Sequence, residues 1–262
     1  MDREELVKVR AEYDAQMRRG ARPDAVGARV ERVGGVVRQS APGTGFHGVL
    51  WSDLDEETAD AAIAEQVAFF GAGAAEFEWK LYDHDRPADL GERLRAAGFA
   101  PEPAETLMVC RTADLAGLPV AAPEGITLRV VKDAAGVELM MEVHRQAFGA
   151  DRPAIRQQLL AMLAEAPERL EAVLAMAGDT PVSAARMEVV PGCSFAGLWG
   201  GGTVAAWRGR GIYRALVAHR TRIAAERAIP YLQVDASSDS RPILERLGFT
   251  PLATTTPWLY GA

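Results

Sequence analysis

Residues 204–216 read Val-Ala-Ala-Trp-Arg-Gly-Arg-Gly-Ile-Tyr-Arg-Ala-Leu, and this stretch decides the fold. It follows an apolar, glycine-rich run, 195–204, that we predict to be a strand. It opens a predicted helix, because Ile212, Leu216 and Ile223 recur near helical spacing. The first amides of a helix have no partner in that helix, and its dipole is positive there. A strand, a glycine-rich turn and a helix start therefore predict a phosphate-binding loop.

Glycines and arginines in this loop support the prediction. Gly209 and Gly211 allow the backbone to approach a ligand closely, and Arg208, Arg210 and Arg214 add charge and hydrogen-bond donors. Glycine-rich turns also precede helices in proteins that bind nothing there, so the loop alone is a hypothesis. A second pattern lies downstream. Leu247-Gly248-Phe249 closes a predicted short helix, 240–247, and opens a strand, with Gly248 suited to a left-handed helix C-cap.

The two patterns together resemble the GNAT family of N-acetyltransferases. Its pyrophosphate loop reads Arg/Gln-x-x-Gly-x-Gly/Ala, and residues 208–213 match it except at Tyr213, where the family has a small residue. The resemblance implies acetyl-CoA as co-substrate and an α/β fold around a mixed, mostly antiparallel sheet. It implies binding of acetyl-CoA by the following residues: Gly202, Thr203, Val204, Arg208, Gly209, Arg210, Gly211, Ile212, Tyr213 and Ser237. The backbone of Thr203 and Val204 would pair with the pantetheine arm, and an N–H near Gly202 or Thr203 would polarise the thioester carbonyl.

The resemblance leaves the proton-transfer groups open. A protonated amine must lose its proton before it attacks, so a base is expected, and Glu188 and Asp235 are the candidates, each of which can also be a solvated surface charge. The family's general acid is a tyrosine four residues before the glycine of Leu-Gly-Phe, where this chain has Leu244. Ser237 or Ser238 could relay a proton through water, and Tyr213 and Tyr260 are further alternatives.

The first half of the chain repeats the order of the second. Leu94-Arg95-Ala96-Ala97-Gly98-Phe99 aligns with residues 244–249, which end in Gly248-Phe249. We therefore predict tandem domains: 1–115, a degenerate GNAT-like copy, and 126–262, the acetyl-CoA-binding catalytic domain. Where the second half has its arginines, the first has Asp53-Leu54-Asp55-Glu56-Glu57. These carboxylates would cap a helix and repel a pyrophosphate. The first half then either walls the acceptor pocket or is purely structural.

Composition excludes other classes of protein. The chain has 262 residues and a formal charge of −7, which disfavours general nucleic-acid binding. No apolar run is long enough to span a bilayer. Cys110 and Cys193 lack metal-type spacing, as do the histidines, and we expect no metal and a reduced, cytoplasmic setting.

The sequence thus predicts an N-acetyltransferase that moves an acetyl group from acetyl-CoA to a primary amine of a small molecule or peptide. The amine would attack directly in a ternary complex. Two alternatives remain: a non-catalytic acyl-CoA-binding or interaction protein, suggested by Leu244, and transfer of a longer acyl group, for which Gly200–Gly202 leave space. The protein is expected to be a monomer or a homodimer.

Overall fold

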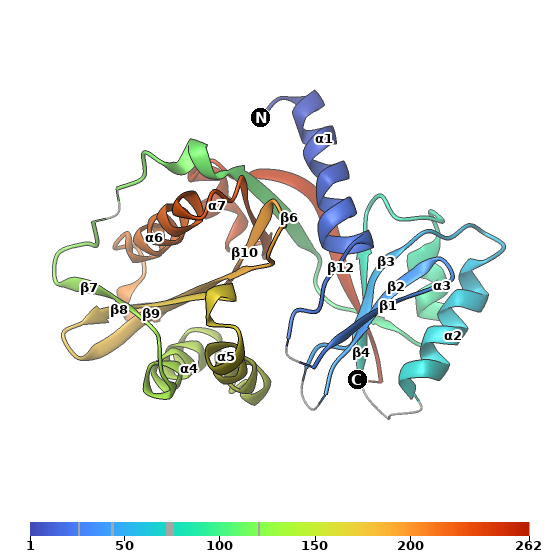
Figure 1. Ribbon diagram of the computed structural model, residues 1–262, viewed down its shortest axis with the longest axis horizontal. Helices are drawn as coiled ribbons and strands as arrows, with labels where there is room; N and C mark the ends of the chain where they lie inside the picture. The colour runs from blue at the N-terminus through green and yellow to red at the C-terminus, as the bar shows by residue number, and fades with distance from the viewer. Residues whose placement is uncertain (26, 43–44, 72–75, 120, 262) are drawn as a thin grey trace. The chain divides into compact units, whose positions relative to one another are not determined.

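The computed structural model describes residues 1–25, 27–42, 45–71, 76–119 and 121–261 (Figure 1). Contacts divide the chain into two compact units. The first unit comprises residues 1–108, 235–243 and 250–262, and the second comprises 109–234 and 244–249. Three elements carry residues of both units: β6 (Glu105–Arg111), β11 (Tyr231–Ala236) and α7 (Arg241–Arg246).

The first unit is built on strands in the order β1-β2-β3-β4-β12, with β5 on β12. The strands are β1 (Arg29–Val33), β2 (Val36–Ser40), β3 (Gly48–Ser52), β4 (Phe77–Tyr82), β5 (Ala100–Pro101) and β12 (Thr250–Tyr260). The helices are α1 (Arg3–Tyr13), which continues as a π-helix over Asp14–Arg19, α2 (Ala59–Gly71) and α3 (Leu90–Ala96). Strands β3 and β4 are parallel, and the pairs β1–β2, β2–β3 and β4–β12 are antiparallel.

The second unit has the strand order β7-β8-β9-β10-β11. Its elements are β7 (Ile126–Val130), α4 (Ala134–Phe148), α5 (Pro153–Glu165), β8 (Leu170–Ala177), β9 (Thr180–Val189), β10 (Phe195–Thr203) and α6 (Ile212–Glu226). Short 3-10 turns cover Thr112–Leu115, Pro167–Arg169 and Ala205–Trp207. Only the β10–β11 pair in this order is parallel. The α/β fold with a mixed, mostly antiparallel sheet is therefore confirmed.

Apolar side chains on both faces of the second unit's sheet are buried, and successive residues of a strand contribute to opposite faces. Leu174 and Ala172 of β8 pack with α4 and α5, whereas Val173 and Ala175 pack with the start of α6. Successive strand side chains point to opposite faces, so the two sets form separate cores. Figure 1 shows α4 and α5 on one side of this sheet and α6 on the other.

Aromatic rings fill the core of the first unit between its sheet and helices α2 and α3. Phe70 of α2 stacks on Phe77 of β4 with ring centroids 4.4 Å apart, and Phe77 meets Phe99 edge-on at 5.2 Å. Trp258 of β12 belongs to the same cluster and is 5% exposed. The core thus joins residues of the 36–99 range with Trp258, which is far from them in the sequence.

The two units share a parallel strand pair joined by a helix and followed by the same short capped helix. Gly98 and Gly248 have φ of +98° and +102°. The amide of the following phenylalanine donates at 3.0 Å to Leu94 O in one case and Leu244 O in the other. Both phenylalanines are 3% exposed. Left-handed glycine caps of this kind end a helix and set the direction of the next strand. The predicted tandem arrangement is confirmed in this geometry.

Two features differ from a direct interpretation of the sequence. The valine-rich run 28–39 has the composition of one continuous strand, but it forms the hairpin β1–β2, turning at Gly34 with φ of +55°. Residues 250–262, which the predicted boundaries place in the second domain, group with the first unit because β12 pairs with β4 along Thr255–Tyr260. Pairing between distant segments is invisible to local sequence patterns.

Because β12 belongs to the first unit, replacing a core residue of β12 should destabilise the strands of that unit. Trp258→Ala removes a buried indole and should lower the free energy of unfolding by about 3–5 kcal/mol. Native-state hydrogen exchange should show lost protection in β4, with β8 much less affected. Val7→Ala, at a position that is 54% exposed, is the control and should change little. Loss of protection confined to β8 would contradict the assignment of β12.

Candidate functional site

The loop between β10 and α6 in the second unit places two glycines in left-handed backbone. Gly209 has φ of +76° and Gly211 has φ of +79°. Among the described residues, a Cβ at Gly209 would meet nothing within 4 Å, and at Gly211 it would meet only Pro123 Cγ, at 3.9 Å. The loop surface is therefore open, and glycine is required here by the backbone conformation rather than by crowding.

No side chain of the described residues caps the start of α6. Gly211 is the N-cap residue and offers no side chain, and the first backbone bond of the helix is from Ala215 N to Gly211 O, at 3.1 Å. The amides of Ile212, Tyr213 and Arg214 therefore have no acceptor within the helix. Together with the positive end of the helix dipole, they suit an anion.

Two arginines flank this helix start without neutralising carboxylates. Arg208 donates from Nε to Thr203 O at 3.0 Å and from Nη2 to Ala147 O at 3.3 Å. Arg210 donates to Ala206 O at 3.2 Å, and its guanidinium lies 4.6 Å from the Trp207 ring centre. Among the described residues, neither guanidinium forms an ion pair. Both positive charges therefore remain available to an anion.

Tyr213 turns away from the loop and packs on the sheet. A Cβ at Gly201 would lie 2.7 Å from Tyr213 Cε2, so only glycine fits beside this ring. The Tyr213 hydroxyl interacts with the guanidinium of Arg220, which is 1% exposed. Burial lowers the pKa of Arg220 to about 10, and Tyr213 partly offsets that effect. The bulky residue at the sixth loop position thus leaves its amide on the helix start while its half-buried ring packs beside Gly201 and Arg220.

Strand β10 is irregular just before the loop. Its register with β9 shifts between Trp199 and Gly202, and Gly200 has φ of +59°. Its parallel pairing with β11 covers Phe195–Gly197, although β10 continues to Thr203. A bulge of this kind leaves backbone groups of the strand outside the ladder. Along the described chain, such groups lie at Gly200 and Gly201.

A buried polar group lies beside the bulge. A Cβ at Gly200 would lie 2.8 Å from both His144 Nε2 and Arg186 Nη1. Arg186 donates from Nε to Glu188 Oε1 at 2.6 Å. His144 is 5% exposed, and its Nδ1 is buried without a hydrogen-bond partner in the part of the chain that is described. Burial, and then the Arg186 charge, lower the pKa of His144 below its usual range, which favours the neutral ring.

The sequence-predicted residues fall into two groups. Gly202, Thr203, Val204, Glu188 and the 208–213 loop all belong to the second unit. Within it, the Val204 amide donates to Val182 O at 2.9 Å, and Ser183 Oγ donates to Gly202 O at 2.7 Å. A ligand could therefore accept a hydrogen bond from the Val204 amide only if the bond to Val182 O were broken.

Asp235 and Ser237 belong to the first unit. The Asp235 carboxylate forms a salt bridge with Lys80, and Ser237 Oγ lies 3.3 Å from Ser240 Oγ. Leu244 of the short helix α7 is fully buried, so its side chain packs in the protein interior. Ser238 is an exposed turn residue, and Tyr260 packs against Phe77 and Phe99.

Sequence reasoning missed His144 and Arg220. His144 belongs to no motif in the sequence, but it lies on the buried face of α4, four residues after Met140. Arg220 lies on the buried side of α6 with Leu216 and Val217. A charged or titratable residue at a core position of a predicted helix was the available signal.

Neither a metal-binding cluster nor a membrane-spanning helix occurs in the described residues. Over the residues with described positions, no group of three or more His, Cys, Asp or Glu side chains could hold a metal ion. Over the same residues, no helix has both the length and the apolar character to cross a bilayer.

Comparison with solved structures decides the fold. A GCN5-related N-acetyltransferase from Kribbella flavida aligns with 97% of this chain and 95% of its own, at a TM-score of 0.71 and 18% identity. A tandem GNAT protein from the clavulanic acid biosynthesis pathway aligns with 99% of this chain and 95% of its own, at a TM-score of 0.65 and 14% identity. The chain has the GNAT fold in tandem.

A third GNAT-fold structure, a GCN5-related N-acetyltransferase from Sphaerobacter thermophilus, covers 89% of this chain at a TM-score of 0.59 and 17% identity. It aligns over 75% of its own length. No family model matches the sequence, and the search of curated proteins finds no similar sequence. At these identities the shared property is the GNAT fold.

One histidine in each unit has a shifted pKa, and the two pKa values shift in opposite directions. His84 bonds to Asp14 and Asp83, and this raises its pKa above the ordinary 6.5, while the pKa of His144 falls below it. Folded His84 holds extra protons, so its stabilising effect is full below 6.5 and is lost as pH rises through its folded pKa. His144 binds more protons in the unfolded protein than in the folded protein. The free energy of unfolding therefore decreases as pH falls below 6.5.

Nuclear magnetic resonance titration of the imidazole protons, assigned with His84→Gln and His144→Gln, measures both midpoints. We expect the His84 midpoint above 6.5 and the His144 midpoint below it. The reverse order would contradict the packing described at the bulge.

Proposed function

We propose that the protein is an N-acetyltransferase that uses acetyl-CoA to acetylate a primary amine of a small molecule or peptide. The observation that carries this proposal is the uncapped start of α6 between two left-handed glycines and two guanidiniums without carboxylate partners. A diphosphate bears the charge and the acceptor oxygens that such a surface suits.

The loop would hold the diphosphate, with the amides of Ile212, Tyr213 and Arg214 donating to its oxygens. Arg208 and Arg210 keep donors beyond those bonded to backbone carbonyls, because a guanidinium carries five N–H groups. The inward position of the Tyr213 ring keeps this surface clear. CoA supplies the thioester whose carbonyl carbon accepts the nucleophile.

The reaction proposed is direct attack of a neutral amine nitrogen on the thioester carbonyl carbon. The new C–N bond forms, the C–S bond breaks, the amine loses a proton, and the thiolate of CoA leaves and gains one. Backbone N–H groups of the Gly200–Gly202 bulge are the proposed donors to the carbonyl oxygen. One preorganised donor of this type lowers a barrier by about 3 kcal/mol.

For the proton, we propose the His144–Arg186–Glu188 group beside the bulge. His144 places its Nε2 beside the bulge and forms a hydrogen bond with the Gly200 backbone, and Glu188 lies within the same unit as the 208–213 loop. Asp235 is a second carboxylate candidate from the sequence. Both carboxylates form a salt bridge, but the Asp235 side chain is 3% exposed against 17% for Glu188, which makes Asp235 the less available base. The role of Arg186 is to position Glu188, at 2.6 Å.

A non-catalytic acyl-CoA-binding protein is the second candidate. The observation that favours it is the buried Leu244 at the place where the resemblance expects an acid. Both candidates require CoA binding at the same loop, and turnover separates them.

Binding of CoA is tested by calorimetry on the full chain. Arg208→Ala combined with Arg210→Ala should weaken CoA binding about tenfold or more, because two charge-assisted contacts are lost. Arg222→Ala is the matched control, since Arg222 is an exposed arginine of the same helix that pairs with Glu226. An unchanged dissociation constant in the double variant would remove CoA from this loop.

Turnover is tested by release of CoA thiol from acetyl-CoA with a panel of primary amines. We expect saturable release, and His144→Gln and Glu188→Gln should lower kcat by about 10²-fold or more where either is the base. Asp235→Asn should have the smaller effect. Tight CoA binding with no release on any amine would support the non-catalytic candidate. Faster release from longer acyl-CoA chains would support transfer of a longer acyl group.

A further inference from the structure

Helix α6 buries an arginine that has no carboxylate partner. Arg220 is 1% exposed, and in the part of the chain that the structure describes its guanidinium forms no ion pair. Its Nη2 is buried without a hydrogen-bond partner among the same residues. Burial of a charge is unfavourable unless an opposite charge and hydrogen bonds compensate it. An apolar side chain of similar size would suit this interior better, so packing alone does not account for the arginine.

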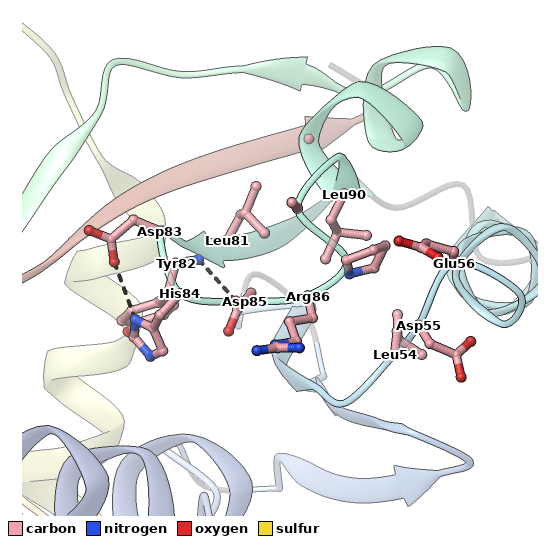
Figure 2. A pocket seen from close by; sticks show the side chains of 13 residues that line it. Leu54, Asp55, Glu56, Leu81, Tyr82, Asp83, His84, Asp85, Arg86 and Leu90 are labelled. Atoms are coloured by element: carbon pink, nitrogen blue, oxygen red, sulfur yellow. Dashed lines mark hydrogen bonds and ion pairs between the residues drawn. The ribbon is translucent and has the colours of Figure 1, made fainter.

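The first unit buries an arginine whose charge is compensated. Arg18 is 2% exposed, its Nη2 donates at 2.7 Å to both carboxylate oxygens of Asp85, and its Nη1 donates to Asp14 at 2.9 Å. Figure 2 shows Asp85 in the segment that follows β4, where it also accepts the Tyr82 amide at 3.0 Å. Arg18 thus joins the π-helix to this segment, which is a structural role. Arg220 has no such pairing.

The hydrogen bonds of Arg220 lead to the bulge in β10. Arg220 donates from Nε to Leu216 O at 3.0 Å, within α6, and from Nη1 to Arg186 O at 2.9 Å, on β9. Arg186 pairs with Trp199, and this is the last pair of the ladder before the register shifts. A side chain of α6 therefore bonds to the backbone of β9 at the edge of the bulge.

Arg220 also holds groups that flank the two bulged glycines. Its guanidinium interacts with the hydroxyl of Tyr213, in the first turn of α6. A Cβ at Gly201 would lie 2.7 Å from Tyr213 Cε2, and a Cβ at Gly200 would lie 2.8 Å from Arg186 Nη1. Each glycine thus lies against a residue that Arg220 contacts. The planar guanidinium carries five N–H groups, so one side chain can serve all these contacts.

We infer that Arg220 is a positioning residue that fixes the Gly200–Gly201 bulge relative to the start of α6. It acts through the carbonyl of Arg186 and the hydroxyl of Tyr213. Backbone donors that polarise a carbonyl lower a barrier only when they are preorganised, so the bulge needs such support. This inference rests on the proposed function, because that function makes the bulge N–H groups the donors to the thioester carbonyl.

Kinetics of the full chain test the positioning role. Arg220→Met removes the guanidinium and keeps a long side chain. We expect kcat for thiol release from acetyl-CoA to fall about 10²-fold, because small displacements of catalytic groups have effects of this size. The dissociation constant of CoA, measured by calorimetry, should change by less than about threefold, because the lost interaction serves the transition state. An unchanged kcat, or a dissociation constant that rises as much as kcat falls, would overturn the inference.

A double-variant cycle tests whether Arg220 and Tyr213 act together. Tyr213→Phe keeps the ring beside Gly201 and removes only the hydroxyl, so kcat should fall here as well. The combined variant should lose less activity than the product of the two single losses, because both substitutions remove the same contact. Fully multiplicative losses would contradict a joint role.

Thermal melting separates positioning from a structural role, with Arg18→Met as the matched control. Arg18→Met leaves the buried Asp85 carboxylate without its partner and should lower the melting temperature. Arg220→Met leaves no charge unpaired and should lower it much less. The opposite order would give Arg220 the structural role and overturn the inference.

Amide NMR spectra of the CoA-free protein test the bulge without turnover. In Arg220→Met the amide shifts of Gly200 and Gly201 should move, whereas that of Gly178, in the turn between β8 and β9, should stay unchanged. Unmoved bulge amides would overturn the inference even in an active enzyme. Wild-type protein that binds CoA and releases no thiol with any amine would instead overturn the proposed function, and the same spectra would still decide whether Arg220 sets the bulge.

Discussion

The absence of a side-chain cap at the start of α6 is the constraint on which the chemistry proposed for the second unit depends. Most helices satisfy their first amides with a serine, threonine, aspartate or asparagine. Here the N-cap is Gly211 in left-handed backbone, so the amides point outward and the dipole is uncompensated. The open space at Gly209 and the inward Tyr213 ring keep that surface accessible. Such a helix start leaves its first amides to water or to a bound anion.

The first unit solves the same structural problem in the opposite way. It has the same parallel strand pair, crossover helix and glycine-capped short helix, yet Asp55 occupies the amides before α2. One architecture thus carries a positive helix start in one copy and a negative one in the other. Because loops can change charge without disturbing the core, duplication lets one copy take a different ligand or none.

Local patterns predicted most of the elements and the glycine-dependent backbone of the 208–213 loop. The glycines at 209 and 211 and the Leu-Gly-Phe pattern need particular backbone angles, and those requirements are visible in residue type. The hairpin at Gly34 was missed because a valine-rich run has no distinct register of its own. The place of β12 depends on pairing with a strand more than 170 positions earlier in the chain, at Phe77–Tyr82.

The candidate site was predictable only where backbone chemistry defines it. The bulge at Gly200 brings His144 and Arg186 together from α4 and β9, and no spacing in the sequence links them. Leu244 was correctly identified as unable to act as an acid, and its full burial gives it a role in the core. Side chains that meet through tertiary packing need the fold before they can be assigned.

The most direct test of the central claim is an amide-resolved NMR titration of the full chain with CoA. The account predicts that the largest shift changes fall on the amides from Gly209 to Arg214, because those N–H groups gain phosphate acceptors. Large changes elsewhere, with the amides of this loop unmoved, would contradict it.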